Sequence, residues 1–461
     1  MSNQLPRTLN QFDAAMMIIG NMIGIGIFAT TGFYAQYLSS PLSLLLVWLL
    51  GGLYAFCGAL TYAELATRFP RAGGDYHFLK HAYHPLLGFL FGWSTFTVTY
   101  TGSAAAIAIG FAAYFSRILP ETLQQWQTPI PFTSLQFPLV KIVALLIAWL
   151  LTWLNSTGIR RGAGFQNLFT LLGIATLMAF IGLGFASGKG SWEHFSAVAG
   201  SGMGLNELSR LGVALVGVVF TYSGWTVLAY IAGEIREPRR NIPAAMAGAV
   251  LTVTLLYILM NAVYLYAQPL DSMSGQVEVG YETLRILFGA GTGAAFALII
   301  MLMVLSSLNA TILSGARIYY AMAREGRFFR SAGQLHPQHQ VPARSLWMQF
   351  GWIALLIVLG SFDQLLTYAV FVMVVFSFLA GLALFVMRRR DPGTETYRAW
   401  GYPITQLIYL AISAWLMINT LYHRPLEALW GILIVAVGVP FYYGWKKRER
   451  GNLKCGRKTT E

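Results

Sequence analysis

The chain has 461 residues, of which 56% are hydrophobic and only 11% are charged. A soluble domain carries roughly 25% charged residues, so this composition excludes water as the main solvent. The formal net charge of +13 is compatible with a nucleic-acid partner, but the basic residues are dispersed among loops without an aromatic-studded basic face. The loop-charge rule of membrane proteins explains the excess, and we expect no nucleic-acid partner.

Apolar runs recur along the whole chain. A bilayer core about 30 Å thick requires roughly 20 apolar residues in a helix, and twelve stretches meet this requirement. They predict an all-α polytopic membrane protein that forms a single transmembrane domain over residues 1–461. Only a dip from Gly360 to Gln364 separates the ninth span from the tenth. The predicted spans are 13–37, 42–66, 86–115, 138–157, 163–186, 209–233, 243–267, 287–321, 345–362, 364–387, 404–422 and 427–445.

Basic residues are divided unequally between the two sides that twelve spans define. The side that holds both termini has 25 of the 31 Lys and Arg residues, and the other side has six. The positive-inside rule therefore predicts that both termini lie in the cytoplasm, in a multi-pass protein of a bacterial inner membrane. The six residues of the other side are Arg117, Lys141, Lys189, Arg210, Arg285 and Arg424.

The predicted spans contain almost no charge at membrane depth and no histidine. Glu64, Lys141, Arg210 and Arg317 all fall near a predicted helix end. Membrane enzymes usually need buried ionisable or metal-binding groups. The sequence therefore indicates no enzyme, no catalytic residue and no metal site.

Glycines crowd the middle of the first span, FDAAMMIIGNMIGIGIFATTGFYAQY. If Ile23, Gly24, Ile25 and Gly26 are unwound, their NH groups lose helical partners and the next half-helix presents its positive end, which suits a carboxylate. We expect unwound carbonyls such as those of Ile18 to Gly20 to suit an ammonium or a small cation. The alternative is that the glycines only permit close helix packing.

The sixth span, LGVALVGVVFTYSGWTVLAYIAGE, is interrupted by Ser223 and Gly224 at mid-depth. It lies five helices after the first span, and Gly-interrupted segments in corresponding positions of two halves point to an inverted-repeat transporter. Phe220, Tyr222 and Trp225 are candidates to line or gate the cavity. Packing is the commoner role for an aromatic residue in an apolar helix.

Several motifs resemble those of the amino acid, polyamine and organocation transporter superfamily. YAELATRFPRAGGDYHFLKHAYHPLLGFLFGW (Tyr62 to Trp93) resembles its signature, and GNMIGIGIF (Gly20 to Phe28) resembles its unwound substrate motif. FTYSGW followed by GEIREPRRNIP (Phe220 to Pro243) resembles its sixth helix and the loop after it. AREGRFF, HPQHQVP and YRAWGYP are most similar to the L-type amino-acid transporter branch. The ordered series covers residues 10 to 445.

The resemblance implies a five-plus-five inverted repeat, with residues 13–186 as the first repeat and 209–387 as the second. Residues 404–445 would add two helices, and 446–461 would form a basic cytoplasmic tail. By carry-over, the first break binds the substrate carboxylate through backbone NH groups, and the second break holds the ammonium or flanks the side chain. The implied substrate residues are Ile23, Gly24, Ile25, Gly26, Phe220, Thr221, Ser223 and Gly224, and the gating residues are Phe220, Tyr222 and Trp225.

Three positions depart from the family pattern. Asn21 stands where serine is common, and Gly173 falls where many relatives carry a lysine thought to occupy the place of a sodium ion. A sodium site formed by Ser306, Ser307 and Thr311 with first-span carbonyls would compensate, since hard cations prefer oxygen ligands. The alternative is that these hydroxyls bond back to their own helix. Residues 116–137 contain no cysteine, so no disulfide-linked heavy chain is expected.

We expect a secondary transporter of neutral L-amino acids, embedded in the lipid bilayer and working by alternating access as an exchanger or a symporter. No cofactor is expected, and Na+ or H+ are the candidate coupling ions. Neutral substrates are favoured because small glycines flank the site and no buried carboxylate is present to pair with a cationic side chain. The alternatives are an amino-acid sensor or a channel on the same scaffold.

Overall fold

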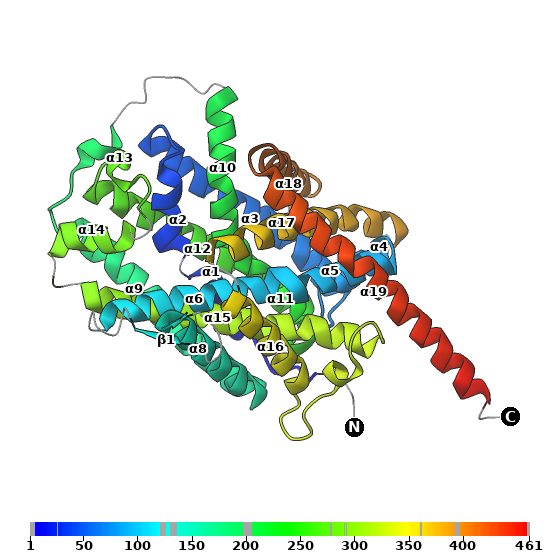
Figure 1. The fold of residues 1–461 in the computed structure, drawn as a ribbon. Coiled ribbons are helices and arrows are strands. Elements are labelled where there is room, and N and C mark those ends of the chain that lie inside the picture. Colours follow the sequence, from blue (N-terminus) through cyan, green and yellow to red (C-terminus); the bar gives the residue numbers. More distant parts are fainter. Residues whose placement is uncertain are drawn as a thin grey trace.

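The structure is a computed structural model in which long helices run beside one another from an end that carries α13 and α14 to an end that carries α4 (Figure 1). We call these ends the α13 side and the α4 side. The C-terminal part of α19 extends beyond the bundle on the α4 side. The structure describes residues 5–24, 26–119, 126–129, 136–196, 205–276, 279–289, 291, 293–359, 362–391 and 397–458.

Helices account for nearly all of the described first half of the chain. A two-stranded antiparallel hairpin, β1 (Gln127–Pro129) with β2 (Gln136–Pro138), lies between α6 and α8. The helices are α1 (Gln11–Met22), α2 (Gly26–Ala35), α3 (Pro41–Arg68), α4 (Asp75–Ala82), α5 (Pro85–Ser94), the π-helix η1 (Thr95–Thr99), α6 (Tyr100–Ile118), α8 (Leu139–Ser156), α9 (Ile159–Ala186) and the 3₁₀ helix η2 (Trp192–Phe195).

The second half continues the same pattern. It ends in one helix that runs through the position of the predicted cytoplasmic tail. Its helices are α10 (Leu205–Tyr222), η3 (Ser223–Thr226), α11 (Val227–Tyr230), η4 (Ala232–Glu234), α12 (Pro238–Ala267), α13 (Leu270–Met273), α14 (Val279–Phe288), α15 (Gly293–Arg324), η6 (Arg330–Gly333), α16 (Ala343–Leu359), α17 (Phe362–Arg390), α18 (Ile404–His423) and α19 (Pro425–Lys458).

The predicted all-α polytopic membrane fold is confirmed. Within the described residues, eleven helical stretches are long and apolar enough to cross a membrane. α16, the counterpart of the predicted ninth span, has 17 residues and is shorter than these, so the count of twelve stays a prediction. α16 and α17 are separate helices, as the dip after Leu359 predicted.

Some predicted boundaries are wrong. The predicted span 287–321 begins in the wrong place, because α14 ends at Phe288 and α15 begins only at Gly293. The short helices α4, α13 and α14 were not predicted, since none of them is long enough to give a membrane-span signal. The division into two repeats stays a prediction.

Local sequence signals explain where several helices begin. Asn10 caps α1, because its side chain accepts from the Asp13 NH at 2.9 Å while the Asp13 carboxylate accepts from the Asn10 NH at 3.0 Å. Ser40 and Ser43 form the same reciprocal pair at α3, which has Pro41 at its first position. These caps satisfy NH groups that a helix start leaves without partners.

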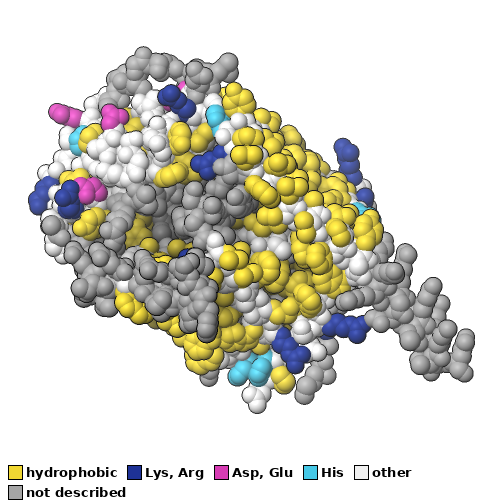
Figure 2. Space-filling view, viewed as in Figure 1, with side chains coloured by type: hydrophobic (Ala, Val, Ile, Leu, Met, Phe, Trp, Pro, Cys, Tyr) yellow, Lys and Arg dark blue, Asp and Glu magenta, His cyan; other side chains and the backbone are white. Residues whose placement is uncertain are grey.

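The outer surface is apolar where helices face away from the bundle. Figure 2 shows a broad hydrophobic surface in the middle of the molecule, with lysine and arginine side chains gathered toward its margins. Such a surface is too large for a soluble monomer and is typical of contact with lipid. Exposed large apolar side chains on α9, α18 and α19 include Leu168, Leu171, Met178, Leu407, Ile418, Leu429, Trp430 and Ile432.

Candidate functional site

The first span is broken at the position that its glycines predicted. α1 ends at Met22, Ile23 has an extended backbone with φ −75° and ψ 96°, and α2 begins at Gly26. Ile25 lies outside the described residues. The prediction that the carbonyls of Ile18 to Gly20 are unwound is wrong, because α1 continues past them and the Ile19 carbonyl accepts from the Ile23 NH at 2.8 Å.

The backbone at this first break is held by side chains from other helices. The hydroxyl of Tyr257 on α12 donates to the Met22 carbonyl at 2.5 Å, and Ser307 Oγ on α15 donates to the Asn21 carbonyl at 3.1 Å. Tyr264, also on α12, donates to the carbonyl of Ile27 at 3.3 Å. The carbonyls of Asn21 and Met22, which the end of α1 leaves without helical partners, are therefore satisfied by two neighbouring helices.

The sixth span is interrupted by a tighter turn of helix. α10 ends at Tyr222, the 3₁₀ helix η3 follows over Ser223–Thr226, and α11 resumes an α-helical course. Ser223 Oγ donates to the Phe220 carbonyl at 2.7 Å, and Thr226 Oγ1 donates to the Ser223 carbonyl at 3.2 Å. The second break thus satisfies its own backbone with local hydroxyls.

Three glycines allow the two breaks and α15 to meet. A Cβ atom on Gly224 would lie 2.6 Å from both Asn21 C and Met22 N, and one on Gly26 would lie 2.5 Å from Thr221 Oγ1. A Cβ on Gly24 would lie 3.1 Å from Ser307 Oγ. Backbone atoms would have to shift to admit a Cβ at Gly224, and the Thr221 side chain would have to shift to admit one at Gly26, so the packing depends on glycine at both positions.

A cavity lies where the breaks meet, and no described residue that lines it carries a charge. Eight of its lining residues bear a hydroxyl group, which gives a neutral but polar wall. Seven residues predicted for the substrate or ion site line it, namely Gly24, Gly26, Phe220, Thr221, Ser223, Ser307 and Thr311. The others are Asn21, Met22, Thr99, Tyr100, Ser103, Ile107, Thr226, Ala369, Val370 and Met373.

Two of the predicted gating aromatics lie elsewhere. Tyr222 is fully buried between Trp48 and Tyr257, and its hydroxyl donates to the Trp48 carbonyl at 3.2 Å. Trp225 packs edge-on against Tyr62, with ring centroids 4.9 Å apart. Neither lines the cavity in this conformation, whereas Phe220 does. Ile23 is buried, and Gly224 contacts the first break instead of the cavity.

The three hydroxyls predicted for an ion site face two different ways. Ser306 Oγ accepts from Gln166 Nε2 at 2.7 Å and lies 2.9 Å from Thr170 Oγ1, both on α9. Ser307 and Thr311 turn toward Asn21 instead, and Thr311 Oγ1 donates to Asn21 Oδ1 at 3.0 Å. Asn21 thus links α1 to α15. Its Nδ2 also donates to the Gly224 carbonyl at 3.3 Å, which links α1 to η3.

One wall of the cavity, formed by η1 and α6, was not predicted from the sequence. The π-helix η1 includes Thr99 and widens the third span just before Tyr100 and Ser103, a type of distortion that is frequent at functional sites. The polar run TYTGS inside an apolar span was the available signal. Ala369, Val370 and Met373 of α17 gave no signal, because apolar residues in an apolar span are unremarkable.

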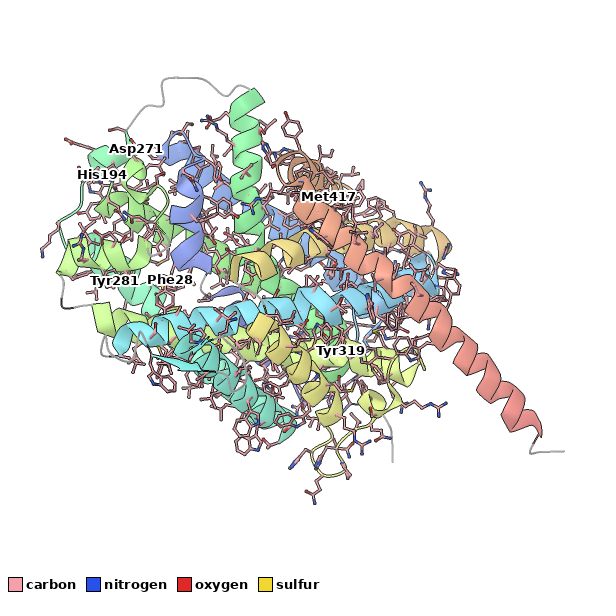
Figure 3. The ribbon with its side chains drawn as sticks, viewed as in Figure 1. Phe28, His194, Asp271, Tyr281, Tyr319 and Met417 are labelled. Atoms are coloured by element: carbon pink, nitrogen blue, oxygen red, sulfur yellow. The ribbon has the colours of Figure 1, made fainter. Side chains whose placement is uncertain are left out.

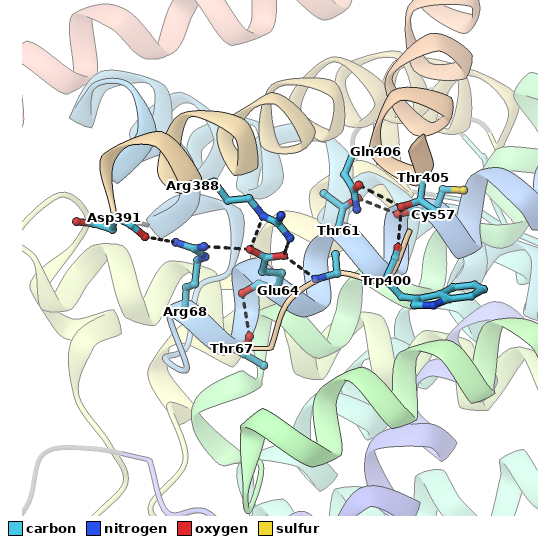
Figure 4. Close-up of polar contacts among 11 residues, drawn as sticks. Cys57, Thr61, Glu64, Thr67, Arg68, Arg388, Asp391, Trp400, Thr405 and Gln406 are labelled. Carbon is cyan, nitrogen blue, oxygen red and sulfur yellow. Dashed lines mark hydrogen bonds and ion pairs between the residues drawn. The ribbon is translucent and has the colours of Figure 1, made fainter. Parts of the chain in front are cut away.

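Buried ion pairs close the α4 side of the bundle. The Glu64 carboxylate on α3 accepts from Arg388 Nε at 2.9 Å, from Arg68 Nη2 at 3.0 Å and from the Ala399 NH at 2.7 Å, which joins α3, α17 and the segment before α18 (Figure 4). Glu234 pairs with Arg317 at 2.8 Å, and both side chains are buried.

The α13 side is built differently. A second pocket, lined by His423 and Arg424 among others, shares Val370 with the cavity and extends toward that side. Figure 3 shows His194 and Asp271 at the α13 end, Phe28 of α2 nearer the middle and Tyr319 toward the opposite end. The cavity therefore adjoins a further pocket on the α13 side, while the buried ion pairs lie on the α4 side.

Comparison with known proteins now identifies the family. A family model described as amino acid permease matches residues 9–441. The chain belongs to the amino acid permease family. The serine/threonine exchanger SteT of Bacillus subtilis (strain 168) is 29% identical over 451 residues, which cover 97% of this chain and 98% of SteT. Human Asc-type amino acid transporter 1 is 27% identical, with 99% of this chain and 85% of the relative covered.

A further relative of this permease is the human large neutral amino acids transporter small subunit 2, which is 27% identical over 95% of this chain and 80% of the relative. The resemblance to the amino acid, polyamine and organocation superfamily is thus confirmed. The protein is a multi-pass membrane transporter of amino acids and not an enzyme, as predicted.

Proposed function

We propose that this permease transports neutral L-amino acids by alternating access, with the substrate bound in the cavity between the two breaks. The observation that carries the proposal is the cavity itself, which lies at both breaks and has eight hydroxyl groups and no charged residue among its described lining residues. A cationic or anionic substrate side chain would have no counter-charge there. A neutral side chain finds both hydrogen-bonding and apolar wall.

The carboxylate of the substrate is proposed to bind at the start of α2. Gly24 and Gly26 line the cavity, and the first NH groups of α2 have no helical acceptor. The helix dipole places partial positive charge at the same end. The ammonium group is proposed to lie near the C-terminal end of α10, beside Phe220, Thr221 and Ser223, where the dipole has the opposite sign.

We propose that both termini lie in the cytoplasm of a bacterial inner membrane. The unequal distribution of basic residues supports this orientation, since the connection that carries α4 belongs to the side predicted to hold 25 of the 31 Lys and Arg residues. The ion pairs of Glu64 and Glu234 then close the cytoplasmic end of the bundle, and rocking of one helix group against the other must open it.

Exchange of one amino acid for another is the proposed mode of transport, with Na+ or H+ symport as the competing mode. The relative SteT is a serine/threonine exchanger, which supports the first mode. A side chain at Gly173 would approach Ile23 and Met303, so the glycine leaves the first break without a fixed cation from α9. Ser307 and Thr311 remain the proposed oxygen ligands of a coupling ion.

Counterflow in proteoliposomes tests the proposal. Vesicles loaded with unlabelled L-serine should accumulate labelled L-serine and L-alanine, but not L-lysine or L-glutamate. Repeating the assay with a sodium gradient, with a proton gradient and with trans substrate alone separates the modes. Absence of saturable flux with every amino acid would contradict the proposal. Binding without flux would indicate a sensor, and ungated conductance would indicate a channel.

No disulfide-linked heavy chain is proposed as a partner. The protein should therefore transport when it is purified and reconstituted alone. Strict dependence of flux on a second polypeptide would overturn this part of the proposal.

A further inference from the structure

Asp75 is a carboxylic acid buried at the start of α4, beside α11, the helix that follows the second break. Its side chain is only 1% exposed, although it lies in the connection between two spans. Gly73 and Gly74 precede it with φ of +116° and +45°, conformations that L side chains rarely adopt. The Gly73 NH donates to the Tyr230 carbonyl at 3.1 Å, so this turn fixes the carboxyl group against α11.

The partners of Asp75 are neutral hydroxyl groups. Tyr62 on α3 donates to Oδ1 at 2.5 Å, while Oδ2 accepts no hydrogen bond of normal geometry from the described residues. The hydroxyl of Tyr230 lies near enough to lower the pKa of the carboxyl group. The other buried acids differ, because Glu64 and Glu234 are each paired with arginine.

The titratable groups around Asp75 do not supply a compensating cation within the described residues. Arg388 and Arg68 are engaged by Glu64, Arg317 by Glu234, and Lys80 by Glu325. Burial lowers the pKa of His77 to about 4, against the raising effect of Glu325, so this neighbour is neutral at higher pH. The titratable groups that act on Asp75 from the packed elements are Tyr62 of α3, Tyr100 of α6, Tyr230 of α11 and Tyr409 of α18. Arg390 of α17 donates instead to the His81 carbonyl at 3.0 Å, in an exposed position.

Burial without a cation penalises the charged form of a carboxyl group. The pKa of Asp75 is accordingly raised by burial from 3.8 to about 6, although the hydroxyls of Tyr62 and Tyr230 act in the lowering direction. The carboxyl group therefore holds a proton in mildly acidic conditions. Any movement that admits water to α4 returns its pKa toward the ordinary value.

One aromatic residue separates Asp75 from the cavity. Tyr230 packs edge-on against Tyr100, with ring centroids 5.3 Å apart, and Tyr100 lines the cavity. The Tyr100 hydroxyl lies 3.5 Å from Thr226 Oγ1 of the second break. Tyr230 belongs to α11, the continuation of that break, so a movement of α11 on substrate binding reaches Asp75 directly.

We propose that Asp75 is a proton-binding site whose occupancy is linked to opening of the bundle on the α4 side. The closed conformation binds the proton, and the opened, hydrated conformation releases it into the cytoplasm. This inference takes from the proposed function the alternation between the two conformations and the cytoplasmic position of the α4 side. It adds a proton as a second bound species and assigns the residue that holds it.

The direction of the pH effect follows from linkage. Because the pKa is higher in the closed conformation, protonation favours closing, and the advantage is fully present below about pH 4. Between about pH 4 and pH 6 the closed-to-open ratio falls by up to about tenfold per pH unit, and above about pH 6 it levels off. The sensitive window therefore lies below neutral pH.

The decisive comparison uses wild-type protein, Asp75→Asn and the control Asp271→Asn, whose aspartate is exposed on α13. Counterflow of L-alanine is measured in proteoliposomes at equal internal and external pH from 4.5 to 7.5. Wild-type and control rates should change below about pH 6 and level off above it, and Asp75→Asn should be flat. A wild-type pH profile in folded Asp75→Asn would overturn the proposal.

Tyr62→Phe keeps the proposal testable if Asp75→Asn does not fold. Loss of the Tyr62 donor removes an interaction that lowers the pKa of Asp75, so the midpoint should move to higher pH. A midpoint at the wild-type value in this variant would count equally against the site.

Infrared difference spectroscopy separates this proposal from the proposed function, because it needs no amino-acid flux. Wild-type protein should show a protonated carboxyl band at pH 5 that disappears at pH 7.5, and the band should be missing from a variant of Asp75. If the band titrates but no amino acid is transported, the proposed function is contradicted and the proton site is not. If amino acids are transported but the band is missing, the proton site is contradicted and the proposed function is not.

Discussion

The two broken helices that meet at the cavity are stabilised in opposite ways. Side chains from α12 and α15 hold the first break, through Tyr257, Tyr264 and Ser307. The second break is a 3₁₀ turn that hydroxyls of its own helix hold, through Ser223 and Thr226. The first break therefore depends on the packing of its neighbours, whereas the second is held mainly by its own helix, with one further hydrogen bond from Asn21 Nδ2 to the Gly224 carbonyl.

The contact between the breaks should be the most sensitive point of the molecule. Gly224→Ala places a Cβ atom against backbone atoms of Asn21 and Met22, which cannot move aside as a side chain can. We expect loss of transport together with a lowered thermal midpoint of the purified protein. Gly248→Ala, at an exposed helical position with open space around it, is the matched control and should behave as wild type. Normal flux in Gly224→Ala would show that the two breaks do not need this contact.

Gly26→Val should abolish transport with a smaller loss of stability. The new side chain would meet Thr221, which can rotate, and would fill the approach to the start of α2. Flux and the amount of protein inserted into the membrane are the two measurements. Gly182→Val on the exposed surface of α9 is the control, because nothing lies within 4 Å of its Cβ position. Wild-type flux in Gly26→Val would refute the assignment of the carboxylate site.

Tyr257→Phe and Ser223→Ala test the difference between external and local support. The first removes a side-chain donor to the Met22 carbonyl, and we expect a loss of about 1 kcal/mol in stability. The second removes a bond within one helix, and we expect a smaller loss. Thermal unfolding of both variants in the same detergent measures the effect. Equal losses would contradict the distinction between the two breaks.

Ser103→Ala should have the smallest effect on stability, because neither break contributes this residue. Ser103 lines the cavity from α6, and its hydroxyl has no hydrogen-bond partner among the described residues. We expect unchanged thermal stability. The apparent affinity for L-serine should fall several-fold relative to wild type, while the affinity for L-alanine should stay the same. Identical affinities for both substrates in the variant and the wild type would exclude a contact between Ser103 and the substrate side chain.

Much of the architecture could be predicted from the sequence, because membrane spans obey a simple length and hydrophobicity requirement. The predicted spans match the long helices closely, and the glycines after Gly20 and the Ser223–Gly224 pair mark both interruptions correctly. The short helices gave no such signal. Residues 18 to 20 were wrongly taken as unwound, because three glycines within seven residues do not specify which turn of the helix ends.

The sequence by itself determined the solvent, the helical class, the two interruptions and the family motifs, since each depends on composition or on residues close in the chain. Tertiary structure decided which side chains face the cavity. In the folded protein Tyr222 and Trp225 are buried in the core, and Ser103 and Val370 line the cavity. The side chains of Ser306 and Ser307 bond to different helices, α9 and α1. Tertiary structure also brought Asp75 against Tyr62 and Tyr230, with no paired cation among the residues that the structure describes. Helix rotation and packing set these directions, and residues far apart in the chain supply the contacts.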